Sequence, residues 1–320
     1  MVREGLAHAP DPFFPGGAYA ILSTPFDPDE GVDEEGLGRL SAFYARAGAR
    51  ALVALAVMGE GAKLDDGERD RAVAAVVHAG AGVPVCVGVS APAARVVRRR
   101  IERAAALGAT SVLLAPSSGM DGEAVVSLFR EAGRAALPIV LQDHPQSSGV
   151  TMPAALIARI LTEVEAVRAV KNEAPPSAVK AEALLALTVG RPFTLLGGLG
   201  ALSLLDELDA GSDGTMTGFA YPEVLTAVTD AYAAGDRARA RLLYEAFLPW
   251  LVFEATASVS LAIRKEFLRL RGRIAHAGVR GPGAAIGPSL RRRARELHEA
   301  FAPLARAHAL VDATDGGGAP

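Results

Sequence analysis

The stretch Val167-Arg168-Ala169-Val170-Lys171-Asn172-Glu173 is a short apolar run that ends in a lysine. Acidic residues precede it and two turn-forming prolines, Pro175 and Pro176, follow it, so the run is typical of a buried strand. A lysine at the end of a buried strand is unusual, because lysine is rarely buried without a partner. A desolvated amine favours its neutral form, which can attack a carbonyl group. Lys171 is therefore a candidate nucleophile, and a lysine that simply reaches water at the sheet edge is the alternative.

The same pattern, a short apolar run followed by a helical pattern, recurs along the chain. The eight apolar runs lie at residues 18–25, 51–57, 85–89, 110–115, 138–142, 167–171, 193–196 and 214–218. Continuous apolar strands that alternate with helices predict an α/β protein with a parallel sheet. Eight such units in about 200 residues predict a (β/α)8 TIM barrel. An open doubly wound sheet is the alternative fold, but no G-x-G-x-x-G follows the first or second run.

The periodicity beyond the eighth run predicts further helices, so we expect a C-terminal helical extension. The predicted segments are an N-terminal extension at 1–15, a barrel catalytic domain at 16–221, a C-terminal helical region at 222–311 and a disordered tail at 312–320. The helical region holds helical patterns at 222–233, 236–254, 258–271 and 290–307, with a Gly/Pro-rich loop at 278–287.

Composition narrows the class of protein. Half of the 320 residues are hydrophobic and the net charge is −3, which gives no indication of nucleic acid. The arginine clusters at 98–100 and 291–293 lie in helical patterns and are typical of solvated helix faces. The single cysteine, Cys86, lies in an apolar run and is expected to be a buried thiol. The N-terminus lacks the apolar core of a signal peptide, and no run reaches membrane-spanning length. We therefore expect a cytoplasmic protein with a small-molecule substrate, no membrane contact and no nucleic acid.

In a barrel of this class, function lies at the C-terminal ends of the strands. Those ends carry one lysine among small polar groups and glycines: Thr24, Met58, Gly59, Glu60, Ser90, Ser117, Ser118, Gln142, Asp143, His144, Lys171, Glu173, Gly197, Gly198, Thr215, Met216 and Thr217. A lone lysine in such surroundings suits Schiff-base chemistry on a 2-oxo acid. No His, Cys and carboxylate residues have metal-ligand spacing, so we expect no metal.

At these positions the chain resembles the dihydrodipicolinate synthase / N-acetylneuraminate lyase family of class I pyruvate-dependent aldolases. The matching pieces are Thr24-Pro25-Phe26, Gly59-Glu60, Asp143-His144-Pro145 with Gly149, Val170-Lys171, and Gly214-Thr215-Met216-Thr217-Gly218 before Pro222. The resemblance extends over about residues 16–308. It implies a barrel with a C-terminal helical part and a homo-oligomer, a dimer or tetramer. It also implies a covalent Schiff base on Lys171 without another cofactor.

The sequence departs from the family pattern at the residues that carry protons and hold the second substrate. The family motif Gly-Thr-Thr-Gly-Glu reads Ala56-Val57-Met58-Gly59-Glu60 here, without either hydroxyl. The resemblance places Gln142 and Ser118 where the family has the tyrosines of a proton relay, and Ser147 where the synthase has an arginine. We therefore do not expect dihydrodipicolinate synthase activity.

Three residues are candidates to replace the missing tyrosine. Glu173 faces the same side as Lys171 if the strand continues, because side chains alternate along a strand. Its carboxylate could act as the base, bind a cationic or polyhydroxylated part of the substrate, or form a salt bridge. His144 is a second candidate base, because histidine titrates near neutral pH; the alternative is a histidine that hydrogen-bonds to the backbone of its loop. Gln142 does not titrate but can orient water or the substrate carboxylate.

The expected substrate-binding groups are Thr24, Asp143, the backbone amides around Met58 and Gly59, and, by resemblance, the carbonyl of Met216. The sequence thus predicts a Schiff-base-forming class I aldolase or lyase that cleaves or forms a 4-hydroxy-2-oxo acid, giving pyruvate and an aldehyde. A 2-oxo acid dehydratase or hydratase of the same family is the first alternative. Dihydrodipicolinate synthase proper and a non-catalytic barrel that binds a keto acid are the others.

Overall fold

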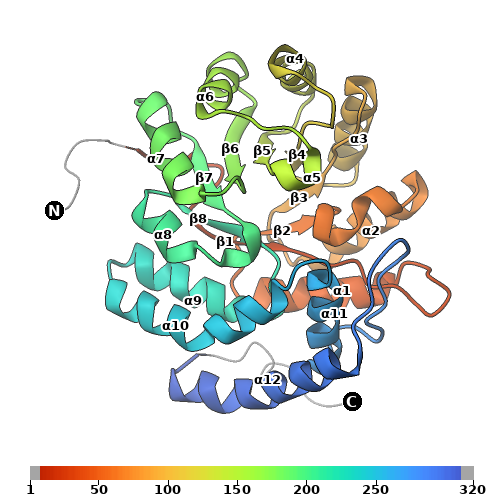
Figure 1. Ribbon diagram of the computed structural model, residues 1–320. Helices are drawn as coiled ribbons and strands as arrows, with labels where there is room; N and C mark the ends of the chain where they lie inside the picture. The colour runs from red at the N-terminus through yellow and green to blue at the C-terminus, as the bar shows by residue number, and fades with distance from the viewer. Residues whose placement is uncertain (1–7, 311–320) are drawn as a thin grey trace. The chain divides into compact units, whose positions relative to one another are not determined.

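The computed structural model describes residues 8–310. Eight strands hydrogen-bond in chain order as a closed parallel barrel (Figure 1). They are β1 Gly17–Ile21, β2 Ala51–Ala54, β3 Val85–Gly88, β4 Ser111–Leu114, β5 Ile139–Asp143, β6 Val167–Asn172, β7 Thr194–Gly197 and β8 Gly214–Thr217. Almost every strand residue is buried, which explains why the strands are continuous apolar runs in the sequence. The predicted (β/α)8 TIM barrel is confirmed.

The helices follow the strands as the periodicity predicts. They are α1 Glu34–Arg46, α2 Asp66–Ala79, α3 Ala94–Ala106, α4 Gly122–Ala132, α5 Pro145–Ser148, α6 Ala154–Glu163, α7 Ser177–Leu187, α8 Leu204–Asp209, α9 Pro222–Ala233, α10 Arg237–Glu254, α11 Ser260–Leu270 and α12 Pro288–Ala307. Asp33 caps α1, and Asp65 forms a capping box with Glu68 at the start of α2. The last four helices confirm the predicted C-terminal helical extension.

Some predicted boundaries were wrong, each for a local reason. The second apolar run does not remain a strand to residue 57, because Leu55 adopts a left-handed conformation (φ 58°) and Val57–Gly59 form a 3₁₀ turn. The four-residue helix α5 is too short to give a periodic pattern, and Gly149 ends it with φ 70°.

The chain divides into two compact units. The first contains the described residues up to Gly16 together with Cys86–Leu199 and Ser203–Met216. Within it, α3, α4 and α6 lie along the outside of β4 to β6 (Figure 1). Cys86 is a buried free thiol, and burial raises its pKa to about 12. This confirms the expectation of a buried thiol.

Part of the predicted N-terminal extension packs onto the first unit. Asp11 accepts two hydrogen bonds from the Arg168 guanidinium, at 2.7 and 2.9 Å, and Arg168 stacks over the Phe13 ring. Thr194 of β7 donates to the Phe14 carbonyl at 2.5 Å. The remainder of that extension, and the tail predicted to be disordered, lie outside the described residues. The predicted domain boundaries stay a prediction.

The second unit contains Gly17–Val85, Gly200–Leu202 and the described residues from Thr217 onward. Its C-terminal helices enclose the aromatic rings of Tyr221, Phe247 and Phe301, whose centroids lie 4.1 to 5.4 Å apart in neighbouring pairs. Arg271 lies over two of these rings and forms a buried ion pair with Glu223 at 2.6 Å.

Within residues 8–310, none of the helices is both long enough and apolar enough to cross a membrane.

Candidate active site

Lys171 lies at the end of β6 and is buried, with 3% of its side chain exposed. Its Nζ atom lies 2.7 Å from Oε2 of Glu173, which is also buried. The ladder with β5 continues past the end of β6, because the Glu173 amide donates to the Asp143 carbonyl at 2.8 Å. The strand geometry therefore persists to Glu173, and the prediction that the two side chains share one face is confirmed.

The Glu173 carboxylate has a donor on each oxygen. Oε2 accepts from the Gln142 amide at 2.8 Å as well as from Lys171, and Oε1 accepts from the backbone amide of Leu199 at 3.2 Å. Burial raises the pKa of the Glu173 carboxyl, but the charge of Lys171, with His144 and Gln142, outweighs burial and holds that pKa below its ordinary value. Glu173 is therefore ionised at neutral pH and forms a buried ion pair with the lysine.

Gly198 makes room for this carboxylate. A Cβ atom at residue 198 would lie 2.4 Å from Cγ and 2.6 Å from Oε1 of Glu173. Any larger residue would displace the Glu173 side chain, since real Cβ contacts are never that short. Gly198, directly after β7, is thus the sequence signal for a bulky group that approaches from the end of the neighbouring strand β6.

Gln142 stands opposite Lys171 in the pairing of β5 with β6 and is buried. Its amide donates to Glu173, so it orients the carboxylate next to the lysine. An amide cannot transfer a proton at this position as a tyrosine could. Glu173 is consequently the titratable group closest to Lys171 among those with described contacts.

His144 lies beside the ion pair and does not point away from it. Its Nδ1 atom is 2.8 Å from the Ser147 hydroxyl and 3.8 Å from Oε2 of Glu173. Burial lowers the pKa of His144, and the nearby Glu173 only partly offsets this. The imidazole is therefore neutral at neutral pH, and Ser147 orients it.

Asp143 makes a contact that differs from the substrate-binding role expected for it. Side chains alternate along β5, so Asp143 points to the opposite face from Gln142, and its Oδ2 pairs with the ammonium of Lys180 on α7. Lys180 also donates to the Met152 carbonyl at 2.5 Å. Burial raises the pKa of Asp143, and Lys180 opposes this rise. We interpret this pair as a structural link between β5 and α7.

One buried acid escaped the sequence analysis. Glu207 on α8 is 1% exposed, and its Oε1 accepts from the Ser177 hydroxyl at 2.6 Å. Burial raises its pKa to about 7. Its Oε2 has no hydrogen-bond partner in the described chain and would lie 1.7 Å from a Cβ atom at Gly197. From the sequence, a glutamate in the middle of so short a helix is expected to be exposed to solvent. Only the glycines at 197 and 198 indicate that a side chain is buried against this part of the chain.

The residues expected to bind the substrate carboxylate after β2 lie in the second unit. The Thr24 hydroxyl donates to the Gly59 carbonyl at 2.6 Å, so Thr24 fixes the turn at Val57–Gly59. The Gly59 amide donates to the Ala56 carbonyl at 2.9 Å and is not available to a ligand. The amides of Val57 and Met58, at the start of this turn, donate to no group within residues 8–310. Of the expected amides, that of Gly59 is therefore occupied, and binding of the substrate by the Met58 amide stays a prediction.

Met216, the last of the expected binding residues, is fully buried in β8. Its neighbour Thr215 is also buried, and the Thr215 hydroxyl has no hydrogen-bond partner in the described chain. Among the residues described, no three His, Cys, Asp or Glu side chains form a group that could hold a metal ion.

Comparison with known proteins identifies the family to which this chain belongs. The sequence profile of the dihydrodipicolinate synthetase family matches residues 15–300. The chain belongs to the dihydrodipicolinate synthetase family. In this family, the crystal structure of a dihydrodipicolinate synthase from Rhodopseudomonas palustris has a TM-score of 0.85 and 32% sequence identity. The match covers 91% of this chain and 99% of that one.

Two curated relatives within the dihydrodipicolinate synthetase family show its range of named activities. A protein of Azospirillum brasilense named L-2-keto-3-deoxyarabonate dehydratase is 30% identical over 295 residues, which is 90% of this chain and 95% of that protein. A 4-hydroxy-tetrahydrodipicolinate synthase of Methylococcus capsulatus is 30% identical over 235 residues, 71% of this chain and 79% of that protein. Membership of the family supports an enzyme of the lyase type.

Proposed function

We propose that the protein is a Schiff-base lyase that acts on 2-oxo acids with a hydroxyl group at C4. Lys171 is the nucleophile and Glu173 moves the protons. The observation that carries this proposal is the buried contact of 2.7 Å between Lys171 Nζ and Glu173 Oε2. A buried lysine whose partner is an ionised carboxylate has a proton acceptor at hand when it must become a free amine.

Imine formation proceeds in balanced steps. The Glu173 carboxylate takes one proton from the Lys171 ammonium, and the free amine attacks C2 of the oxo acid. The carbinolamine then loses its hydroxyl group as water, with the proton held by Glu173. The product is an iminium ion on Lys171, and Glu173 is again a carboxylate. No metal or organic cofactor takes part in this proposal.

Dehydration is the reaction that we favour from this iminium ion. The iminium acidifies the hydrogen atoms at C3, and C3 is bonded to the carbon that is attached to Lys171 Nζ. A carboxylate in contact with Nζ is therefore well placed to take a C3 proton and form an enamine. The enamine then expels the C4 hydroxyl, which leaves as water with the proton from Glu173. Hydrolysis releases an unsaturated 2-oxo acid and restores Lys171. The name of the Azospirillum relative, a dehydratase, adds support.

Cleavage of the C3–C4 bond is the second candidate, and His144 favours it. Aldol cleavage needs a base for the C4 hydroxyl, further from the lysine than C3. His144 lies 3.8 Å from Glu173, and its lowered pKa leaves the imidazole neutral and able to accept that proton. Pyruvate and an aldehyde would then be the products. Dihydrodipicolinate synthase activity is not proposed, because Gln142 and Ser147 lack the chemistry expected at those positions.

Reductive trapping tests the common step. Borohydride reduction in the presence of pyruvate should give a stable adduct on Lys171, detected by peptide mass spectrometry. Lys171→Arg is the matched control, because arginine keeps a positive charge next to Glu173 but forms no imine. An adduct on a different lysine, or none with the natural protein, would overturn the proposal.

Product analysis separates the two reactions. A 4-hydroxy-2-oxo acid that loses water without release of pyruvate supports dehydration. Release of pyruvate with an aldehyde supports cleavage. Trapping without turnover of any such substrate would instead support a binding protein.

We also propose, from the family resemblance, a cytoplasmic homo-oligomer. Light scattering on the purified protein and cell fractionation test these two points.

A further inference from the structure

A cavity of about 430 Å³ lies in the second unit, where the loop after β1 meets the C-terminal helices. Its walls come from residues 26–30, from α11, from the Gly/Pro-rich loop and from the start of α12. Arg291, the first residue of the arginine cluster at 291–293, lines it. The volume falls within the range of pockets that hold small molecules. None of the lining residues takes part in the proposed reaction.

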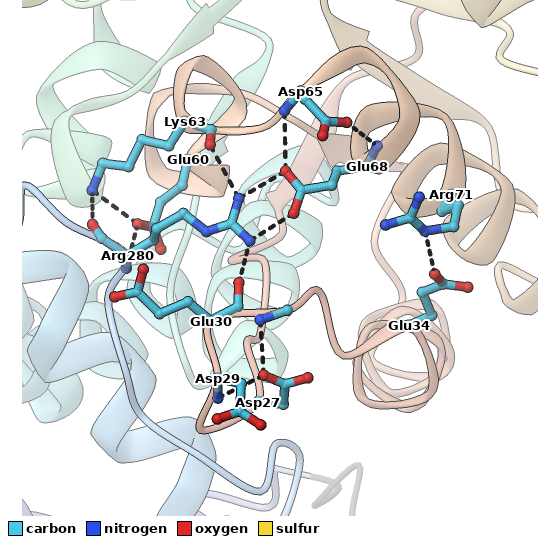
Figure 2. A network of polar contacts seen from close by, with 11 residues as sticks. Asp27, Asp29, Glu30, Glu34, Glu60, Lys63, Asp65, Glu68, Arg71 and Arg280 are labelled. Carbon is cyan, nitrogen blue, oxygen red and sulfur yellow. Dashed lines mark hydrogen bonds and ion pairs between the residues drawn. The ribbon is translucent and has the colours of Figure 1, made fainter.

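The cavity walls are held by hydrogen bonds that need no ligand. The Arg280 guanidinium forms two parallel hydrogen bonds with the Glu68 carboxylate of α2, at 2.7 and 2.8 Å. It also donates to the Glu30 carbonyl in the loop after β1, so that Figure 2 shows Arg280 between Glu68 and Glu30. Lys63 donates to the Arg280 carbonyl at 2.6 Å. The Gly/Pro-rich loop is thus fixed to two other segments, and the cavity is preformed.

Two of the carboxylates in the cavity wall are already engaged by donors of the protein. Glu266 of α11 is buried, and it accepts two hydrogen bonds from the Arg269 guanidinium, at 2.8 and 2.9 Å. The Asp27 carboxylate accepts from the backbone amides of Asp29 and Gly31, at 2.9 and 2.8 Å (Figure 2). Neither carboxylate therefore needs a cationic ligand.

The hydrogen-bonding groups that lack a partner in this cavity are mainly cationic. Arg291 donates from Nε to the Ile286 carbonyl at 3.2 Å, and its Nη1 and Nη2 atoms donate to no group within residues 8–310. Nη1 of Arg269 and the ring of His276 also form no hydrogen bond in the described part of the chain. The third acid of the wall, Glu30, is exposed to solvent. The free donors thus outnumber the free acceptors.

The charges around Glu266 indicate a positive potential in the cavity. Hydrogen bonds from Arg269 hold the pKa of the Glu266 carboxyl below its ordinary value, although burial raises it. The charges of Arg291 and Arg295 lower that pKa further. The first turn of α12 contains no acidic residue that would offset them. The same positive charge favours an anionic ligand.

We propose that this cavity binds a small organic anion, a carboxylate or a phosphate ester, whose oxygen atoms accept hydrogen bonds from Arg291, Arg269 and His276. Guanidinium groups suit this role, because their N–H groups bind carboxylate and phosphate oxygens in pairs. The carbon part of the ligand contacts Ala262 and Ile286, which are buried in the wall. The proposal does not depend on the proposed function, since it concerns different residues.

Calorimetric titration of the full-length protein with citrate and with glycerol 3-phosphate tests the proposal and separates the two kinds of anion. Sodium chloride at about 0.15 M screens non-specific attraction. Arg291→Gln removes the proposed charge. Arg292→Gln is the matched control, because Arg292 is exposed, does not line the cavity and gives the same change in net charge. Circular dichroism shows whether each variant is folded.

We expect one binding site per chain for citrate, for glycerol 3-phosphate or for both. Arg291→Gln should weaken this binding about tenfold, because a charge-assisted hydrogen bond is lost, and Arg292→Gln should change it less than about twofold. Glu30→Gln should tighten binding by about twofold, because it removes a negative charge from the cavity wall.

Absence of binding of both anions would overturn the proposal. Equal weakening by Arg291→Gln and Arg292→Gln would also overturn it, because that result shows an effect of net charge alone. Should Arg291→Gln fail to fold, His276→Gln takes its place. A loss of about threefold is then expected, and unchanged binding would count against the site.

Discussion

Replacing Glu207 by glutamine should stabilise the protein at high pH and leave its stability unchanged at low pH. Glu207 is 1% exposed, and burial raises its pKa from 4.5 to about 7. A carboxyl group with a raised pKa binds a proton more tightly in the folded state, so the unfolding free energy falls as the pH rises from the unfolded to the folded pKa. Below about pH 4.5 both states are protonated, and above about pH 7 the full cost is present.

The size of the effect follows from the same pKa. A rise from 4.5 to about 7 corresponds to about 3 kcal/mol of unfolding free energy, since one pKa unit is worth about 1.4 kcal/mol. Glutamine has the shape of the protonated acid, and its carbonyl can accept from Ser177 as Glu207 Oε1 does at 2.6 Å. The Glu207→Gln variant therefore keeps the hydrogen bond and never acquires the buried charge.

Urea unfolding of both proteins measures this difference. We expect unfolding free energies that agree within about 0.5 kcal/mol near pH 4 and a variant that is about 2–3 kcal/mol more stable near pH 8.5. Comparing the two proteins at each pH cancels the contributions of all other titrating groups. Ser177→Ala provides a control that removes the hydrogen bond without removing the charge. A difference that does not change with pH, or a variant that is less stable at high pH, would refute the reasoning.

Three further substitutions test the site. Glu173→Gln should lower turnover by about 10²–10⁴ and slow borohydride trapping of pyruvate on Lys171, because Glu173 carries protons in imine formation as well as in the later steps; unchanged turnover and trapping would contradict a proton-transfer role. Gly198→Ala should reduce turnover strongly because its Cβ atom would meet Glu173, and an alanine variant with normal kcat would exclude that contact. Lys180→Met should cost about 3–5 kcal/mol in urea unfolding, because it leaves the buried Asp143 carboxyl without its partner. Unchanged stability would mean that this ion pair contributes little.

The barrel could be predicted from the sequence because local and tertiary preferences agree along most of it. Asp33 and Asp65 stand directly before the helices they cap, and the eight strands are almost entirely buried and mostly apolar. The shared face of Lys171 and Glu173 follows from the two-residue period of a strand. Helix α5 could not be predicted in this way, because its four residues are too few to show a helical repeat of apolar positions.

The contacts of the site were less predictable, because they depend on which distant residues meet. The sequence offered no means to decide whether Glu173 would face substrate or pair with Lys171, and the structure gives it the lysine, Gln142 and the Leu199 amide. The prediction that the Gly59 amide binds the substrate carboxylate was wrong, because this amide donates to the Ala56 carbonyl within the turn. The burial of Glu207 depends on how α8 packs, which hydrophobic periodicity in six residues does not specify.

The two consecutive glycines at the end of β7 place a constraint on how this sequence can diverge. Gly197 leaves space for Glu207 on one face of the strand, and Gly198 leaves space for Glu173 on the other. A side chain gained at residue 198 is tolerated only if residue 173 becomes smaller, and the same dependence joins residues 197 and 207. Among relatives of this chain, residues 198 and 173 should therefore covary, and so should residues 197 and 207, each pair independently of the other. Changes in the first pair would alter the carboxylate beside Lys171, and changes in the second pair would alter the packing of α8.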